Sequence, residues 1–333
     1  MQERSVFEQL ADQIGAGTSK IIPRIFAALT DEDEARLLLA ASPPACAADL
    51  AERCGLAPAV VESMIDPLFR KGLLFKSHKP DGVRYYRVKH PLQFHDSTAV
   101  AVDPVPGMLA LWKEFMDTEW AGFIGEFSQL LPGEVLRVIP VNVTIEPDAQ
   151  VLAFEDVRSM IDSARNIAVT RCSCRAIDGA CGQPVEVCIQ LDRAADYGIE
   201  RGTGRALSKT EAIEMLEMCE RKGLVHVTEN KQALGMVICN CCSDCCINWT
   251  TIRTGVGKFA APSRFRAEVI EDSCSGCELC IDRCFFDALA MSGDDNVAVV
   301  HTEKCMGCGL CKVVCEPGAI AMKVARPEAF IPA

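Results

Sequence analysis

The cysteines carry the clearest chemical signal in this sequence. The chain has 20 of them among 333 residues, and eight form two runs that share the spacing C-x2-C-x2-C-x3-C. The first run begins at Cys274 and the second at Cys305. Three closely spaced thiolates can each bind one iron of a [4Fe–4S] cube, and the fourth ligand must then come from elsewhere. Two zinc sites would use simple CxxC pairs, which do not explain a doubled four-cysteine run, so the spacing predicts two [4Fe–4S] clusters.

The residues around these two runs, from about Phe265 to Ala325, resemble a bacterial-type two-cluster ferredoxin. The runs read CSGCELCIDRCFFDALAM and CMGCGLCKVVCEPGAIAM. In that family the fourth ligand of each cluster comes from the other run. The resemblance therefore implies these two ligand sets: Cys274, Cys277, Cys280 and Cys315; and Cys305, Cys308, Cys311 and Cys284. One departure is that the family's proline after each fourth cysteine is absent, because Phe285 and Glu316 occupy those positions.

Nine more cysteines lie in the middle of the chain, in two groups. The first group falls within CSCRAIDGACGQPVEVC and the second within ICNCCSDCCINW. They are Cys172, Cys174, Cys181, Cys188, Cys239, Cys241, Cys242, Cys245 and Cys246. Four thiolates could close a zinc site, but nine thiols exceed one such site. The neighbouring ferredoxin-like runs therefore favour iron–sulfur ligation here too.

The number of centres in the middle segment stays open at this level. Nine thiols could hold two more [4Fe–4S] clusters with one left over, or one cluster together with a reactive thiol group. The adjacent pairs Cys241–Cys242 and Cys245–Cys246 cannot easily bind the same cube, because neighbouring side chains diverge. We therefore expect one member of each pair to serve one centre, and its neighbour to serve a second centre or the core.

Other polar residues near these groups carry weaker signals. His226, in the strand-like segment LVHV, is expected to be structural rather than a metal ligand. Arg171, Arg175 and Lys231 could offset cluster charge or bind an anionic substrate. The sequence has no dinucleotide-binding fingerprint, phosphate-binding loop or Ser-His-Asp set, which argues against flavin or nicotinamide binding.

Charge and composition indicate the cellular compartment and the class of partner. The formal net charge is −12, which argues against nucleic acid and fits docking to a basic protein surface. The N-terminal segment has no signal-peptide core, and no apolar run reaches the roughly 18 residues that a membrane span needs. We therefore expect a cytoplasmic protein without a membrane span, in which thiols stay reduced and disulfides are not formed.

Residues 31–88 resemble the winged helix-turn-helix of the MarR-like and ArsR-like families. The resemblance rests on three helical segments and a hairpin: DEDEARLLLAA, CAADLAERCG, APAVVESMIDPLFRKGLLF and LLFKSHKPDGVRYYRV. A recognition helix needs Arg, Lys, Asn or Gln near its N-terminal end to read base edges, and here that stretch reads APAVVES. Only the wing is basic, with Lys76, Lys79, Arg84, Arg87 and Lys89. DNA is therefore not the expected partner, and a docking or dimerising module is predicted.

These segments together predict an α+β multidomain protein. The expected domains are a helical and winged-helix-like domain over 1–100, a helical connector over 101–165, an α/β cysteine-rich iron–sulfur domain over 166–260, and a ferredoxin-like domain with two [4Fe–4S] clusters over 265–333. A capping box formed by Ser208 and Glu211 predicts a helix that ends at Gly223. The stretch that begins at Ile247, INWTTIRTGVGKFAAPSRFRAE, is expected to be a linker.

The expected function is transfer of single electrons between a redox partner protein and an iron–sulfur centre in the middle domain. The middle groups followed by the ferredoxin repeat resemble ferredoxin-domain proteins of anaerobic bacteria and archaea, which implies an anaerobic context. The resemblance implies no particular reaction, so whether the protein is an enzyme stays open. The alternatives are a reductase whose middle cluster has an open iron for a small substrate, and a redox-sensing transcription regulator. The chain is expected to act as a homodimer or as a subunit of an oxidoreductase complex.

Overall fold

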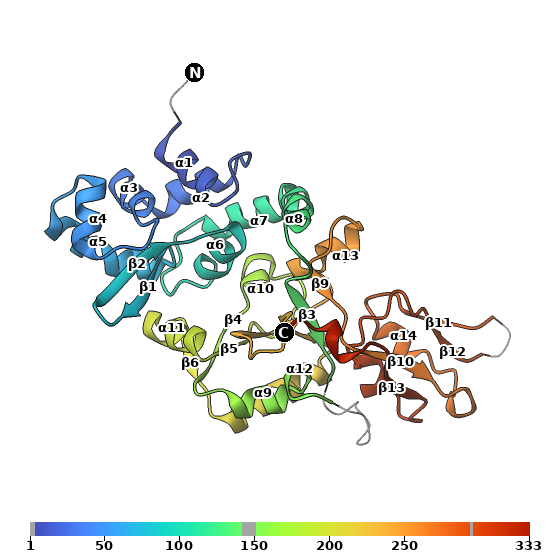
Figure 1. The fold of residues 1–333 in the computed structure, drawn as a ribbon. Helices are drawn as coiled ribbons and strands as arrows, with labels where there is room; N and C mark the ends of the chain where they lie inside the picture. The colour runs from blue at the N-terminus through green and yellow to red at the C-terminus, as the bar shows by residue number, and fades with distance from the viewer. Residues whose placement is uncertain (1–3, 142–150, 294–295) are drawn as a thin grey trace. The chain divides into compact units, whose positions relative to one another are not determined.

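The computed structural model describes residues 4–141, 151–293 and 296–333, and it is mixed α/β (Figure 1). The chain forms two compact units. Unit 1 contains Met1–Phe123, Arg171–Ala180 and Glu200–Thr203; unit 2 contains Ile124–Thr170, Cys181–Ile199 and Gly204–Ala333. None of the helices in the described ranges has the length and apolar character that crossing a membrane requires.

Unit 1 consists of helices and one hairpin. Its elements are α1 (Val6–Gln13), α2 (Ile22–Leu29), α3 (Glu32–Ala40), α4 (Ala47–Cys54), α5 (Pro58–Lys71), β1 (Leu74–Lys79), β2 (Gly82–Arg87), α6 (Pro91–Thr98), α7 (Met108–Thr118), the start of α8 (Trp120–Gln129) and α10 (Ser173–Asp178). A capping box at Asp31 and Glu34 begins α3. Gly55 and Gly72, both left-handed, end α4 and α5, as their places after the two apolar patterns predict.

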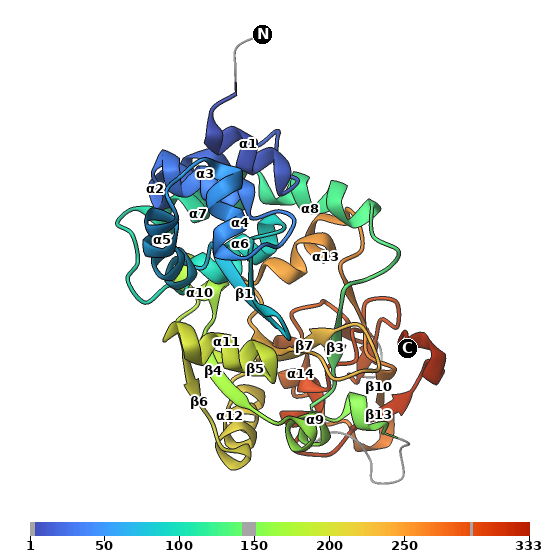
Figure 2. The ribbon, with the colours of Figure 1, turned by 60° about the vertical axis from the view of Figure 1, so that its left-hand side comes forward.

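Three helices and a hairpin lie between residues 31 and 88, in the order that the sequence predicts. Strands β1 and β2 pair antiparallel, from Leu74 opposite Arg87 to Lys79 opposite Gly82 (Figure 1). Figure 2 shows β1 and the helices of unit 1 from another side. The assignment of this segment to the winged-helix families stays a prediction.

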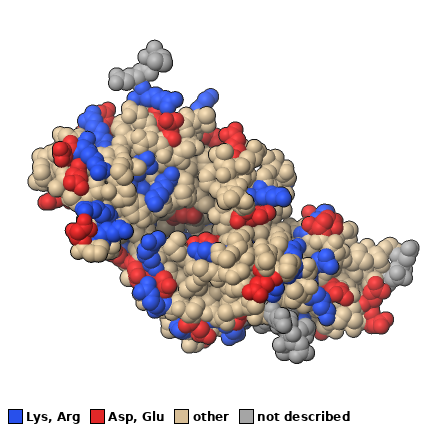
Figure 3. All heavy atoms as spheres, viewed as in Figure 1, with Lys and Arg blue, Asp and Glu red and all other residues tan. Residues whose placement is uncertain are grey.

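Most basic side chains of this hairpin region have contacts within unit 1. These contacts are Lys76 with Glu200 at 2.7 Å, Arg84 with Asp81 at 2.5 Å, Arg87 with the Gln13 amide oxygen at 2.6 Å, and Lys89 over the Tyr86 ring. On the face drawn in Figure 3, basic and acidic side chains are intermixed. Cations engaged in this way are less available to phosphates. That DNA is not the partner stays a prediction.

Unit 2 is organised around a seven-stranded sheet with the order β6-β4-β5-β8-β7-β3-β9. The strands are β3 (Leu136–Ile139), β4 (Ile167–Arg171), β5 (Glu186–Leu191), β6 (Gly204–Ala206), β7 (Val225–Glu229), β8 (Val237–Cys241) and β9 (Ala260–Ala261). The helices that belong wholly or mainly to this part are α9 (Val157–Ser163), α11 (Arg193–Arg201), α12 (Lys209–Arg221) and α13 (Thr250–Thr254). Helices α9 and α12 pack on the sheet through a core that includes Ile161, Leu216, Ile189 and Ile238.

Local sequence signals explain where several of these elements begin and end. The predicted capping box starts α12, where the Ser208 side chain accepts from the Glu211 amide. Strand β3 consists of the mostly apolar residues Leu136–Ile139, and residues 142–150 lie outside the described residues. A short 3-10 turn, Ala153–Glu155, precedes α9.

The C-terminal part of unit 2 repeats one pattern twice. Strand β10 (Phe265–Val269) pairs with β13 (Ile320–Val324), and β11 (Leu289–Met291) pairs with β12 (Ala298–Val300). The short helices α14 (Leu279–Asp282) and α15 (Leu310–Val313) occupy the same place in the two cysteine runs. The sequence repeat is therefore also a repeat of structure.

The stretch from Ile247 onward is not a linker, contrary to the expectation from sequence. It contains a 3-10 turn (Ile247–Trp249), α13 and β9, and β9 pairs parallel with β3. Trp249 and Phe259 are each 1% exposed. The apolar residues of this stretch follow neither a helical nor a strand period, so the pattern does not reveal that they are buried.

Candidate metal centres

Two hollows in the C-terminal part of unit 2 are each lined by four cysteines. Site A is lined by Cys284, Cys305, Cys308 and Cys311. Site B is lined by Cys274, Cys277, Cys280 and Cys315. Each site takes three cysteines from one run and one from the other, which is the division that the ferredoxin resemblance implies. That these cysteines bind iron stays a prediction.

Burial disfavours the charged thiolate form of these cysteines unless a cation is present. It raises the pKa of Cys308 to about 12, and it also raises the pKa of Cys280, Cys284 and Cys311. Four neutral thiols around an apolar hollow have little reason to converge, whereas four thiolates are stabilised by iron. The amide of Ala298 also approaches the Cys274 sulfur, at 3.5 Å, as expected near a sulfur that carries negative charge. The donor set of each site, four cysteines, therefore fits a [4Fe–4S] cluster.

The loop that carries Cys305 and Cys308 is held from outside the repeat. Val141 donates its amide to the Cys308 carbonyl oxygen at 2.9 Å, and the Ser263 hydroxyl donates to the Gly307 carbonyl oxygen at 2.7 Å. Gly307 has φ +67°, and a Cβ there would meet the Phe265 carbonyl oxygen. The loop therefore needs glycine at this position both for its backbone conformation and for its close approach to β10.

The two sites differ in exposure and in charge. Cys277 of site B is exposed, and Glu278 also lines that site. Site A lies beside two arginines: Arg283 lines it and interacts electrostatically with Cys308, and Arg326 interacts with Cys305. Positive charge stabilises the reduced, more negative state of a cluster, so we expect site A to have the higher reduction potential.

The change Arg283→Ala is expected to lower the reduction potential of site A by tens of millivolts, since about 1 kcal/mol corresponds to about 40 mV for one electron. Arg283→Lys keeps the charge and should keep most of the potential. The measurement is a redox titration of both variants followed by EPR. Equal potentials for the wild type and Arg283→Ala would show that this charge does not act on the site.

Three aromatic rings connect site A to the middle cysteines. Phe285 and Phe286, directly after Cys284, line site A and lie 5.9 and 5.2 Å from the ring of Trp249, centroid to centroid. The indole NH of Trp249 donates to the Cys242 carbonyl oxygen at 3.0 Å. Phe285, which stands where the ferredoxin family has proline, thus packs between the segment of Cys284 and the segment of Cys242.

One group of middle thiols, here called site C, lies at the end of strands β5 and β8. Hydrogen bonding with Cys239 and Cys246 raises the pKa of Cys241 well above its ordinary value. The register that pairs Ile189 with Ile238 places Cys188 beside Cys239 on the neighbouring strand. We group Cys239, Cys241 and Cys246 as site C, together with Cys188, whose inclusion rests on the strand register alone.

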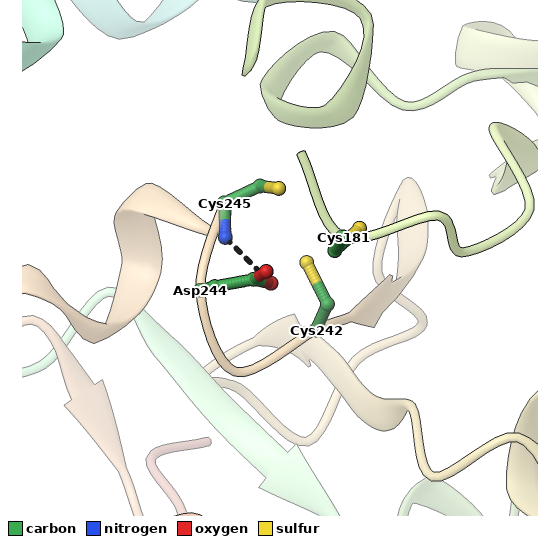
Figure 4. Close-up of side chains that lie close together, drawn as sticks. All are labelled: Cys181, Cys242, Asp244 and Cys245. Carbon is green, nitrogen blue, oxygen red and sulfur yellow. Dashed lines mark hydrogen bonds between the residues drawn. The ribbon is translucent and has the colours of Figure 1, made fainter. Parts of the chain in front are cut away.

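A second group, site D, contains a residue that the sequence did not single out. The ligand atoms of Cys181, Cys242, Asp244 and Cys245 all lie within 4.8 Å of one another (Figure 4). Each adjacent cysteine pair is therefore divided between sites C and D, with Cys241 and Cys246 in the former and Cys242 and Cys245 in the latter. In the sequence, Asp244 is marked only by its position among five cysteines. That position does not indicate that the carboxylate faces the thiols.

The two earliest middle cysteines belong to unit 1. Cys172 caps the start of α10, and Cys174 lies in its first turn. Hydrogen bonding with Cys174, together with burial, raises the pKa of Cys172. The Arg175 side chain is buried and favours the charged form of Cys172. As iron ligands these two cysteines stay a prediction.

His226 has the environment of a structural residue. It is fully buried, with Nδ1 2.6 Å from the Asn240 amide oxygen and Nε2 3.3 Å from the Glu220 carboxylate. Both ring nitrogens are thus engaged within the core, which leaves neither for a metal. Cys219, also fully buried, packs in the core.

Comparison with known proteins identifies one segment of the chain. Residues 298–321 match the family of 4Fe-4S binding domains, and they include Cys305, Cys308, Cys311 and Cys315. No curated protein and no solved structure gives a significant match. The chain thus contains a 4Fe-4S binding domain at these residues, within a cysteine-rich protein that is suggested to act in iron–sulfur electron transfer.

Proposed function

We propose that the protein is a multi-cluster iron–sulfur protein that transfers single electrons between a redox partner and a centre in its cysteine-rich middle segment. The observation that carries this proposal is the pair of four-cysteine hollows, sites A and B, supported by the 4Fe-4S binding domain at 298–321. When bound, a [4Fe–4S] cluster takes up or releases one electron. The four thiols of site C would hold a third cluster, and sites A and B the first two.

The surrounding residues have separable tasks in this proposal. Cys277 and Glu278 bring site B to the surface, where a partner can approach closely. Phe285, Phe286 and Trp249 fill the space between site A and the middle loop, and this packing excludes water. The arginines beside site A favour the more negative, reduced state there.

Charge and topology suggest what the partners are. A chain with a formal net charge of −12 is attracted to a basic surface on another redox protein. The helices and hairpin of unit 1, which resemble a winged helix, would serve as the docking or dimerising module. The protein would then act as a homodimer or as a subunit of an oxidoreductase complex in an anaerobic cytoplasm.

Iron and sulfide content with EPR spectroscopy tests this function directly. The full chain, purified without oxygen, is expected to contain about twelve irons and twelve sulfides, from three [4Fe–4S] clusters. Chemical reduction should produce EPR signals broadened by coupling between neighbouring clusters. About eight irons would remove site C from the proposal, and a chain without acid-labile sulfide would overturn it.

A further inference from the structure

Site D differs from the other cysteine sites in how closely its ligand atoms converge. One thiol comes from the loop before β5, and the other three ligands come from the turn that follows β8 (Figure 4). Within the described ranges it is the one group of three or more Cys, His, Asp or Glu residues whose ligand atoms lie within 4.8 Å of one another. The eight cysteines of sites A and B form no group as compact as this.

This compactness fits one metal ion better than a cube. With metal–sulfur bonds of about 2.3 Å, ligands arranged as a tetrahedron around one ion lie about 3.8 Å apart, and never more than about 4.6 Å. On a [4Fe–4S] cube each thiolate binds a different iron, and the bonds diverge from the corners. Thiolates on a cube are therefore farther apart than thiolates on a single ion.

The donors select the class of metal. Three thiolates and one carboxylate are a ligand set for a divalent ion that prefers sulfur, as zinc does, and tetrahedral coordination needs four such donors. Oxygen-preferring ions such as Mg²⁺ or Ca²⁺ would not be expected among three sulfurs. Cys242 and Cys245 are buried, whereas Asp244 is exposed, so an ion would reach the site from the side of the carboxylate.

The turn that supplies three of the ligands is held in place by backbone contacts. The Arg253 guanidinium donates to the Ser243 carbonyl oxygen at 2.8 Å and to the Cys246 carbonyl oxygen at 3.0 Å. The amide of Cys245 donates to the Asp244 carboxylate at 2.9 Å, which orients that carboxylate. Because these contacts are already made by the protein, little reorganisation is needed to bind a metal.

We propose that site D binds a single divalent metal ion of the zinc class through Cys181, Cys242, Asp244 and Cys245. The site is separate from the iron–sulfur clusters of the proposed function. Two ligands, Cys242 and Cys245, are buried thiolates, Cys181 is half-buried, and the fourth ligand is a surface carboxylate that can exchange. Binding of the ion would hold the loop before β5 against the turn after β8. That turn also carries Cys246 of site C.

Metal analysis of the full chain tests this proposal. The wild type, purified without oxygen, is expected to hold about one zinc per chain in addition to its iron. Cys242→Ser and Cys245→Ser should lose the zinc and keep their iron and sulfide. Cys54→Ser, a matched change of a thiol in unit 1, should keep both. Asp244→Asn should bind zinc more weakly, by about 10- to 100-fold in competition with a chelator.

Cobalt gives a second readout that does not depend on a variant folding correctly. Co²⁺ added to the wild type in place of zinc is expected to show thiolate-to-cobalt charge-transfer absorption and tetrahedral ligand-field bands. Wild type that binds neither Zn²⁺ nor Co²⁺ with these bands would overturn the proposal. So would loss of about four irons, rather than zinc, from Cys242→Ser, because these thiols would then serve a cube. Absence of iron from sites A and B would instead count against the proposed function and leave site D intact.

Discussion

Cys284→Ser is expected to abolish the cluster of site A and to leave the cluster of site B in place, although Cys284 belongs to the first cysteine run. The reason is that Cys284 lines site A together with three cysteines of the second run. Loss of one thiolate from a closed four-thiolate site should remove about four of the twelve expected irons. The EPR signal that disappears should be the same one that disappears in Cys308→Ser.

Cys277→Ser is the matched control for this change. Cys277 lies in the same run as Cys284 but lines site B, so its loss should affect the other EPR signal. Serine replaces sulfur by oxygen with little change in size, which keeps steric effects small. If Cys284→Ser and Cys277→Ser removed the same signal, the cysteines would pair within one run and the exchange of the fourth ligand would be wrong.

Trp249→Ala is expected to destabilise unit 2 by about 3–5 kcal/mol, the usual cost of truncating a buried aromatic residue. Trp249 is 1% exposed, packs on Phe285 and Phe286, and donates to the Cys242 carbonyl oxygen. The cavity left behind would also let water approach site A and loosen the turn of site D. Anaerobic denaturant unfolding, followed by circular dichroism, measures the stability.

Trp249→Phe separates packing from the hydrogen bond. Phenylalanine keeps most of the contact with Phe285 and Phe286 but has no NH to donate to Cys242. The lost hydrogen bond should lower the free energy of unfolding by only about 1 kcal/mol, in addition to the effect of the smaller ring. Stopped-flow reduction gives a second readout, because the middle centre should be reduced more slowly in Trp249→Ala. If Trp249→Ala left both the free energy of unfolding and the reduction rate of the middle centre unchanged, Trp249 would not connect site A with the middle cysteines.

The spacing of the eight C-terminal cysteines predicted two four-ligand sites, and the resemblance to two-cluster ferredoxins implied how the cysteines divide between them. Helix ends at Gly55, Gly72 and Ser208 were also predictable, since each depends on a short local signal. The spacing within each run and these helix ends share one property: the residues that determine them lie close together in the chain. Their physical causes can therefore be recognised without knowledge of the fold.

The features that the sequence did not reveal depend on distant contacts. The segment containing Trp249 and Phe259 looked like a linker, because its burial comes from the C-terminal repeat and from pairing with β3. The divergence of neighbouring side chains predicted that adjacent cysteines serve different centres, and as a statement about ligands this stays a prediction. The sequence did not predict which thiols belong to which site. That Asp244 lies among the thiols of site D becomes visible only once the turn after β8 is placed against Cys181.

The exchange of cysteines between the two runs also has a consequence for how the protein is made. A nascent chain that has not yet reached Cys305 offers site A one cysteine, Cys284, and offers site B three. Neither ligand set is then complete. If the proposed clusters occupy these sites, iron delivery would follow synthesis of the second cysteine run, and a premature stop codon before Cys305 would eliminate both clusters at once.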